Sequence, residues 1–311
     1  MPAPSALHTN ARLSQLSVEY SNPEYIWNQL FPVVKVNKRS DLYTVYNKES
    51  KFRVYDDYVN ANSSPNQVDW NVSTDNYSVR SHALADYVSQ EEQDNADVPI
   101  QPMVDTNDFL NSLLDIAQEQ RVATKTFTVA NYGTNKVTLS GTGQWGQSAD
   151  DPIGSMLTAV ESCFVRANVI VMGQAVWEIY RKLPEILDAV KASSRFQTNS
   201  GGLATQDEIA NLFGVQKVLV GRARVLTNKE GQTNAYARLW GKHAVAMYVA
   251  PSIGIKTLTF GATFSESLRQ TQTMFDPTKG EKGSTYVKVA WNSDEKIIAA
   301  DCGYMIENAV P

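Results

Sequence analysis

The stretch from residue 33 to residue 97 most constrains the fold, because it carries strand signals but cannot build a core of its own. Apolar and polar residues alternate through 33–36, 42–46, 52–59 and 70–87, a pattern typical of half-exposed strands. Leu, Ile and Phe are scarce throughout the stretch. Since an isolated hairpin is marginal in water unless it packs on a partner, we predict an extended two-stranded arm rather than a domain.

A second arm precedes it. Residues 1–32 are mostly polar, with two early prolines, and a segment of this composition becomes ordered only by lying on something else. Its end carries a small apolar cluster of Tyr25, Ile26, Trp27 and Leu30. We expect this cluster to anchor the arm on the body.

The charges of the 33–97 stretch are divided along the sequence, with an excess of Lys and Arg in its first part and of Asp and Glu in its second. One interpretation is a solvated hairpin. The other is that the basic part of one copy meets the acidic part of its neighbour and fixes the register between subunits. The candidate inter-subunit contacts are Trp27, Lys48, Lys51, Arg53, Asp56, Asp57, Glu91 and Glu92.

A long helix follows two prolines, Pro99 and Pro102. Asp105 or Thr106 can cap its start, and we predict that it runs to about Arg121. Its expected apolar stripe consists of Phe109, Leu110, Leu113, Leu114 and Ala117. Residues 134–145 then read as a strand and a glycine-rich turn.

Residues 150–260 combine helices with short buried strands, which predicts a compact α+β lobe. Asp150 or Asp151 with Pro152 opens one helix, and residues 168–173 are a buried strand. Pro184 is expected to break a second helix. Residues 193–202 form a polar loop.

The stretch 203–228 has the clearest local signals. Thr205 and Glu208 form a capping box, and Gly214 ends the helix that they start. The β-branched run 217–221 reads as a buried strand, and 222–226 as a second strand. No side chain in the stretch is chemically reactive.

The remaining residues return to long strands. We predict strands at 243–249, 256–264 and 286–291, and a turn at 292–295. The last residues, 303–310, also read as strand. The C-terminus is therefore expected to be tied to the body that contains the long helix.

Nothing in the sequence indicates catalysis, a metal or a cofactor. The Gly141-x-Gly-x-x-Gly146 run lacks the preceding strand and following helix of a dinucleotide site. The three histidines show no ligand spacing, and the two cysteines, Cys163 and Cys302, read as buried hydrophobes. We expect no enzyme and no cofactor, although an enzyme of an unfamiliar α+β class stays open as an alternative.

The charge and hydropathy of the sequence limit the classes of partner that the chain can have. The formal net charge is −5, which argues against a protein that coats nucleic acid but allows a surface that merely faces it. The N-terminus lacks the apolar core of a secretory signal, and the longest apolar stretch, near 244–255, is too short to span a bilayer. We expect a soluble chain made in a cytoplasm, with no membrane partner.

Three blocks of the sequence together resemble the major capsid proteins of tailed bacteriophages, the Hong Kong 97-type family. They are residues 168–187, residues 203–226 with the run VLVGRA, and residues 291–310. The likeness extends in matching order over essentially the whole chain.

The resemblance implies an α+β, capsid-type subunit. Its segments would be an N-terminal arm (1–32), an extended β-hairpin called the E-loop (33–97), a P-domain with a long spine helix and long strands (98–149 and 266–311), and an α/β-like A-domain (150–265). It also implies self-assembly through pentamers and hexamers into an icosahedral shell around double-stranded DNA, in the host cytoplasm.

The family further implies a portal, a scaffolding protein and, in some members, decoration proteins. Because the arm starts at Met1 without a long helical leader, we expect any scaffolding protein to be a separate chain. Some members cross-link a Lys of the E-loop to an Asn of a neighbour. Lys48 and Lys51 lie in that element, but no Asn or catalytic Glu can be matched, so we predict no cross-link. An encapsulin shell around an enzyme cargo is the alternative function.

Overall fold

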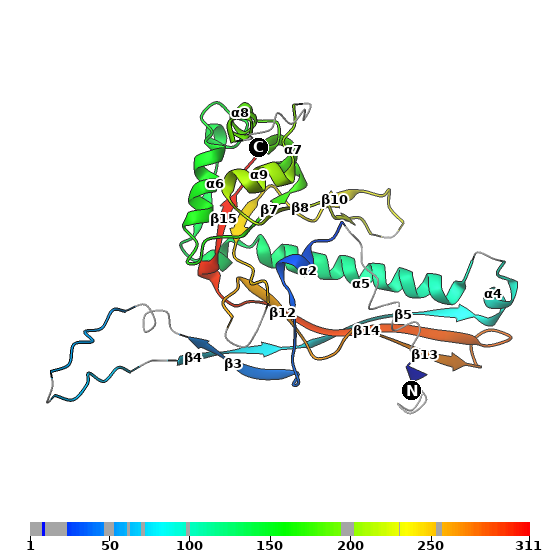
Figure 1. The fold of residues 1–311 in the computed structure, drawn as a ribbon. Helices are drawn as coiled ribbons and strands as arrows, with labels where there is room; N and C mark the ends of the chain where they lie inside the picture. Colours follow the sequence, from blue (N-terminus) through cyan, green and yellow to red (C-terminus); the bar gives the residue numbers. More distant parts are fainter. Residues whose placement is uncertain are drawn as a thin grey trace.

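The structure of this chain, a computed structural model, describes residues 8–9, 24–46, 53–60, 63–69, 72–97, 100–193, 202–229, 231–252 and 257–311. Figure 1 shows an elongated sheet with one long helix lying along it, a lobe with a second sheet standing above, and a hairpin that extends beyond the long sheet. The molecule is therefore α+β, as the sequence predicts.

The long sheet is organised around β14 (Ser284–Ile297). One edge of β14 pairs with β5 (Arg80–Ser89), and the other edge pairs first with β13 (Gln270–Asp276) and then with β12 (Gly261–Ser265), all antiparallel. The outer strands are β2 (Val33–Lys35), parallel to β12, and β1 (His8–Thr9), antiparallel to β13. A single 14-residue strand thus pairs directly with three other strands of the long sheet.

The predicted turn at residues 292–295 is wrong, because β14 continues through it. Along this part of the strand Trp291, Ser293 and Glu295 are buried in alternation. Ser293 Oγ donates to Glu295 Oε1 over 3.0 Å, and Arg121 Nε donates to Glu295 Oε2 over 3.1 Å. The polar residues therefore have partners inside the fold, which removes the usual reason for a polar run to lie in a turn.

The long helix is α5 (Pro102–Thr126), which lies along the long sheet in Figure 1. It starts earlier than the predicted caps at Asp105 or Thr106, because Pro102 occupies the first turn, where its missing N–H costs nothing. It also continues one turn beyond Arg121. The predicted apolar stripe is half right: Leu110 and Leu114 are buried against the sheet with Val88, Val287 and Val289, whereas Phe109 and Leu113 are exposed.

The second sheet has the strand order β6–β15–β11–β7–β8. Its strands are β6 (Lys136–Thr138), β15 (Gly303–Glu307), β11 (Ala244–Met247), β7 (Val169–Gly173) and β8 (Lys217–Gly221). Alternate residues of β7 face two different cores: Ile170 and Met172 pack with the helices of the lobe, and Val169 and Val171 pack with residues near the C-terminal end of α5. The sheet therefore joins the lobe to the rest of the molecule.

The helices of the lobe are α6 (Pro152–Glu161), α7 (Gln174–Tyr180), α8 (Pro184–Ser193) and α9 (Gln206–Phe213). The predicted break at Pro184 is confirmed, since α7 ends before it and α8 begins at it. The capping box is also confirmed: Thr205 N donates to Glu208 Oε2 over 2.8 Å, and Glu208 N donates to Thr205 Oγ1 over 3.3 Å. Gly214 ends α9 in the left-handed conformation, with φ 62°.

Short 3-10 turns complete the described chain, at Val129–Tyr132, Gly141–Gly143 and Ala300–Cys302. The strand after β8 starts at Arg224, two residues later than predicted. The predicted boundaries between P-domain and A-domain, after residues 149 and 265, stay predictions. Strands from both sides of each boundary pair within the same sheet. β6 and β15, expected in the P-domain, pair in the second sheet, whereas β12, expected in the A-domain, pairs in the long sheet.

Candidate assembly surfaces

The long hairpin (residues 40–78) has an anchored root. Its strands are β3 (Ser40–Tyr46) and β4 (Val72–Ser78), which pair with each other. At the root, the Tyr77 ring stacks on Phe264 with centroids 4.9 Å apart. Tyr43 Oη donates to Asp75 over 2.7 Å, and Lys296 Nζ lies 2.8 Å from the same carboxylate. Burial would raise the pKa of Asp75, but the hydrogen bonds from Lys296 and Tyr43 outweigh it and lower that pKa.

The middle of the long hairpin is exposed wherever it is described. The side chains of Val54 and Tyr58 are 96% and 75% exposed, and the predicted contacts Arg53, Asp56 and Asp57 are exposed as well. Lys48 and Lys51 lie outside the described residues. The expected two-stranded arm is confirmed for β3 and β4 but is wrong for the rest of residues 33–97, because β2 and β5 pair with strands of the long sheet. The contacts of the charged residues with a neighbour stay predictions.

Glu91 and Glu92 do not lie on this hairpin. They belong to α4 (Gln90–Asn95), a short helix after β5, and Figure 1 places α4 and the hairpin at opposite ends of the long sheet. Ser89 caps α4 and exchanges hydrogen bonds with Glu92. Glu91 and Glu92 are therefore separated from the long hairpin within one subunit, because the ten residues of β5 pair with β14, whereas Asp56 and Asp57 stay on the hairpin with Arg53.

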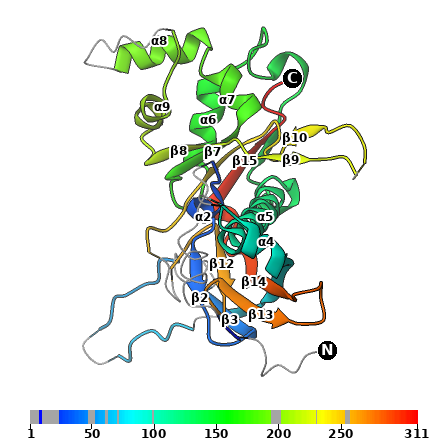
Figure 2. The ribbon, with the colours of Figure 1, turned by 90° about the vertical axis from the view of Figure 1, so that its right-hand side faces the viewer.

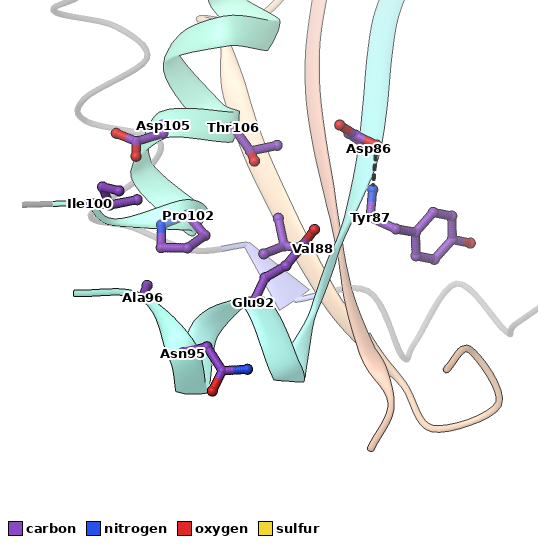
Figure 3. Close-up of a pocket in the computed structure, with 10 residues that line it drawn as sticks. All are labelled: Asp86, Tyr87, Val88, Glu92, Asn95, Ala96, Ile100, Pro102, Asp105 and Thr106. Carbon is purple, nitrogen blue, oxygen red and sulfur yellow. Dashed lines mark hydrogen bonds between the residues drawn. The ribbon is translucent and has the colours of Figure 1, made fainter. Parts of the chain in front are cut away.

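A groove of about 390 Å³ lies between β5, α4 and the start of α5 (Figure 3). Its lining residues are Asp86, Tyr87, Val88, Glu92, Asn95, Ala96, Ile100, Pro102, Asp105 and Thr106. Three carboxylates and several apolar side chains line it, with no basic group among the lining residues. The acidic end of the molecule, defined as α4 with the first turns of α5, therefore presents a surface suited to a cationic and apolar partner.

The N-terminal arm reaches the body at α2 (Trp27–Leu30). The predicted anchor is confirmed, since Ile26 and Leu30 are buried in the core beside α5. The Trp27 ring packs against Trp291 of the same chain, with centroids 5.5 Å apart. A contact of Trp27 with a neighbouring copy stays a prediction.

One buried carboxylate fixes this anchor. Glu119 of α5 accepts hydrogen bonds from the backbone N–H groups of Ile26 and Trp27, at 3.1 and 2.9 Å, and from Trp240 Nε1 at 2.7 Å. Burial raises the pKa of Glu119, and these hydrogen bonds oppose the increase. This role of Glu119 is not among the predictions made from the sequence.

The face of α5 toward the long sheet is largely polar. Arg269 Nη2 donates to Asp115 over 2.6 Å and Nη1 to Asn111 over 3.2 Å. Thr271 Oγ1 donates to Asn107 over 2.8 Å. Sequence reasoning missed this row, although its members recur at four-residue spacing: Asn107, Asn111, Asp115 and Glu119. Helix and sheet are held together here by directional bonds as well as by apolar contact.

Several chemical sites are not found among the described residues. No group of three or more His, Cys, Asp or Glu side chains there could hold a metal ion. No helix in the described ranges is long and apolar enough to cross a membrane. The Gly141-x-Gly-x-x-Gly146 run forms a 3-10 turn rather than a phosphate-binding loop. Both cysteines are buried, and burial raises the pKa of Cys163 to about 12.

Sequence comparison relates the chain to phage shell proteins along nearly its whole length. No family model matches it. The major capsid protein of Pseudomonas phage JBD67 is 29% identical over 300 residues, which are 96% of each chain. The major capsid protein of Burkholderia phage BcepMu is 25% identical over 305 residues, 94% of each chain.

Solved structures with the same fold decide the architecture. A phage-related protein from Bordetella bronchiseptica RB50 aligns with a TM-score of 0.77 at 24% identity, covering 98% of this chain and 99% of its own. The capsid of cyanophage P-SCSP1u aligns with a TM-score of 0.64 at 7% identity, covering 91% and 88%. This chain has the phage major capsid fold. The Hong Kong 97-type, α+β capsid architecture expected from the sequence is therefore confirmed.

In this capsid fold, the features described above are surfaces and anchors rather than a reaction centre. The long hairpin extends from a body whose cores are buried, the acidic end closes the long sheet at its other end, and the described part of the N-terminal arm packs on the body at α2.

Proposed function

We propose that copies of this chain assemble into the icosahedral head shell of a tailed phage, which encloses packaged double-stranded DNA. The observation that carries the proposal is the likeness to two phage major capsid proteins over at least 94% of each chain. The chain would act as a structural protein of the virion, without catalysis.

The geometry supports assembly by repeated contacts between unlike surfaces. The long hairpin at one end of the long sheet differs in shape and charge from the acidic end at the other. Contacts between unlike patches close into rings when the rotation between copies allows it. Pentamers and hexamers are the rings that a closed icosahedral shell requires.

Further partners follow from the same proposal. We expect a separate scaffolding protein, a portal and, in some heads, a decoration protein, with assembly in the cytoplasm of the bacterial host. The inner surface would face DNA without sequence preference, in line with the net charge of −5. We expect no covalent cross-link through Lys48 or Lys51. Denaturing gels of mature particles should show monomers, and covalent ladders would refute this point.

Expression of the full chain, alone and with its phage's scaffolding protein, tests the proposal. Negative-stain microscopy and sedimentation should reveal closed shells with phage structural partners. Small shells that copurify with an enzyme cargo would support the encapsulin alternative instead. Discrete small oligomers with enzymatic turnover would contradict a shell function altogether.

A further inference from the structure

We propose that the hairpin formed by β9 (Arg224–Leu226) and β10 (Tyr236–Arg238) docks on the exposed side of the first turns of α5 in a neighbouring copy of this chain. This contact rests on the proposed shell function, because it joins unlike surfaces of adjacent subunits. It concerns the short hairpin of the lobe and not the long hairpin (residues 40–78).

The short hairpin projects with little support of its own. β9 and β10 pair with each other and join neither larger sheet. Figure 2 shows them leaving the lobe sideways, beyond α5 of the same chain. A hairpin of three residue pairs is marginal in water unless it packs on a partner. The short hairpin can therefore contact a second molecule that lies beside this copy.

The root of the short hairpin is held firmly. Leu239 N donates to Ala223 O over 3.0 Å, and Arg238 forms an ion pair of 2.9 Å with Glu178 of α7. Trp240, two residues after Arg238, is fully buried and donates a hydrogen bond to Glu119. The hairpin is therefore presented in a defined direction, which lowers the entropic cost of docking.

The hairpin exposes an apolar pair within a basic segment. Leu226 and Tyr236 are direct partners across the strands, and 46% and 66% of their surfaces are exposed. Residues 222–242 contain five Lys or Arg and a single acidic residue. Arg222, Arg224 and Lys229 take part in no ion pair between described residues.

The exposed side of α5 offers the complementary pattern. Phe109 and Leu113, one helical turn apart, are 55% and 37% exposed. Asp105 lies one turn earlier on the same side, and Asp108 is adjacent. The pKa of Asp108 is raised by burial and by the nearby Asp105 charge, so a cation from outside would relieve an existing repulsion.

The two patches also match in spacing. Side chains directly opposite each other in an antiparallel pair lie about 4.5–5.5 Å apart at Cβ, and helical residues four apart lie about 5–6 Å apart. Two apolar side chains of the hairpin can therefore pack on two of the helix, with the basic strand ends beside the acidic first turn. The partner is a second copy of this chain, since each copy carries both patches.

Disulfide trapping in assembled shells tests the contact. The variant Phe109→Cys/Tyr236→Cys should form shells that give covalent ladders on non-reducing gels, while either single variant gives monomers. The matched variant Phe109→Cys/Leu157→Cys, which places the second thiol on an exposed position of α6 in the lobe, should also give monomers. Ladders from that variant, with monomers from the first, would overturn the proposal.

Charge reversal gives a second readout. Arg224→Asp or Asp105→Arg alone should lower the yield of shells about tenfold or more, whereas the double variant should recover it to within about twofold. Lys191→Glu, an exposed reversal on α8 at the far end of the lobe from the short hairpin, serves as the control and should assemble normally. Normal yield from both single reversals, in a chain whose wild type forms shells, would refute this contact alone. A wild type that forms no shells would refute the proposed function and this contact together.

Discussion

Glu119 links three parts of the chain through a single side chain. It lies on α5, and its fully buried carboxylate accepts hydrogen bonds from the start of α2 and from Trp240, which follows the short hairpin. No cation pairs with it among the described residues. Its stability contribution therefore comes from the donors that it satisfies, because an unsatisfied buried N–H is costly.

Replacing this carboxylate by an amide tests that role. Glu119→Gln turns one acceptor oxygen into a donor NH₂ that faces other N–H groups, so we expect a loss of about 1–3 kcal/mol in the free energy of unfolding. Urea unfolding of the unassembled chain measures it. The matched control Glu185→Gln, on the exposed side of α8, should change stability by less than about 0.5 kcal/mol. An equal effect of the two variants would contradict the role of Glu119.

The ion pair between Arg121 and Glu295 should appear in the pH dependence of stability. Burial would raise the pKa of Glu295, but the charge and hydrogen bond of Arg121, together with hydrogen bonds from Ser293 and Gln118, outweigh burial and lower that pKa below its ordinary value of 4.5. A lowered folded-state pKa stabilises the fold above the unfolded-state value and stops doing so as the pH falls through the folded-state value. The stability advantage of wild type over Glu295→Gln should thus be full at pH 6–7 and shrink below about pH 4.5.

The same comparison in an Arg121→Gln background isolates the cause. Without the guanidinium, the advantage of Glu295 over Gln should lose most of its pH dependence. Unfolding curves at pH 3.5, 4.5 and 6.5 would decide, and an advantage that grows toward low pH would contradict the assignment.

At the scale of elements, the start of α9 is stabilised by its capping box. The Thr205 hydroxyl and the Glu208 carboxylate each satisfy a backbone N–H at the start of the helix. Thr205→Ala should lower the free energy of unfolding by about 1 kcal/mol, whereas Thr205→Ser should retain most of it. Chemical denaturation of the three proteins measures both values. Equal loss in the Ala and Ser variants would mean that the hydroxyl is not the stabilising group.

Local signals such as this one were sufficient to predict several elements from the sequence. The capping box, the break at Pro184 and the buried strand β7 depend on neighbouring residues, so their patterns are visible in the chain itself. The polar end of β14 was misread as a turn because Glu295 finds Arg121 only in three dimensions. The face of α5 was half misread for the same reason, since Arg269 lies far along the chain.

At the scale of the whole molecule, the separation of charge is the feature that sequence reasoning could only half predict. The division into basic and acidic parts is readable along residues 33–97, but the pairing of β5 with β14 carries Glu91 and Glu92 to the opposite end of the long sheet. Within one subunit Glu91 and Glu92 therefore lie at the opposite end of the long sheet from the long hairpin, whereas the acidic Asp56 and Asp57 lie on that hairpin with Arg53. A contact between Glu91 or Glu92 and the basic residues of the hairpin requires a neighbour.

The basic segment of the long hairpin can be tested by reversing its charge. The variant Lys48→Glu/Lys51→Glu/Arg53→Glu should fold as a monomer, with an unfolding midpoint close to that of wild type, because Arg53 is exposed, an exposed charge contributes little to stability, and the described packing of the hairpin on the body is at its root. Its assembly should fail or slow strongly, since like charges would then face the acidic part of the neighbour. Circular dichroism and sedimentation separate the two effects, and a normal particle yield would refute the role of this segment.

We propose that copies of this chain form the closed wall of a phage head around its portal. Cryo-electron microscopy of the particles formed by the full chain with its scaffolding protein tests this most directly. We expect an icosahedral reconstruction in which copies of this one fold occupy the pentamer and hexamer positions of the wall. Particles whose walls are built from another protein, or preparations that contain only small open oligomers, would contradict it.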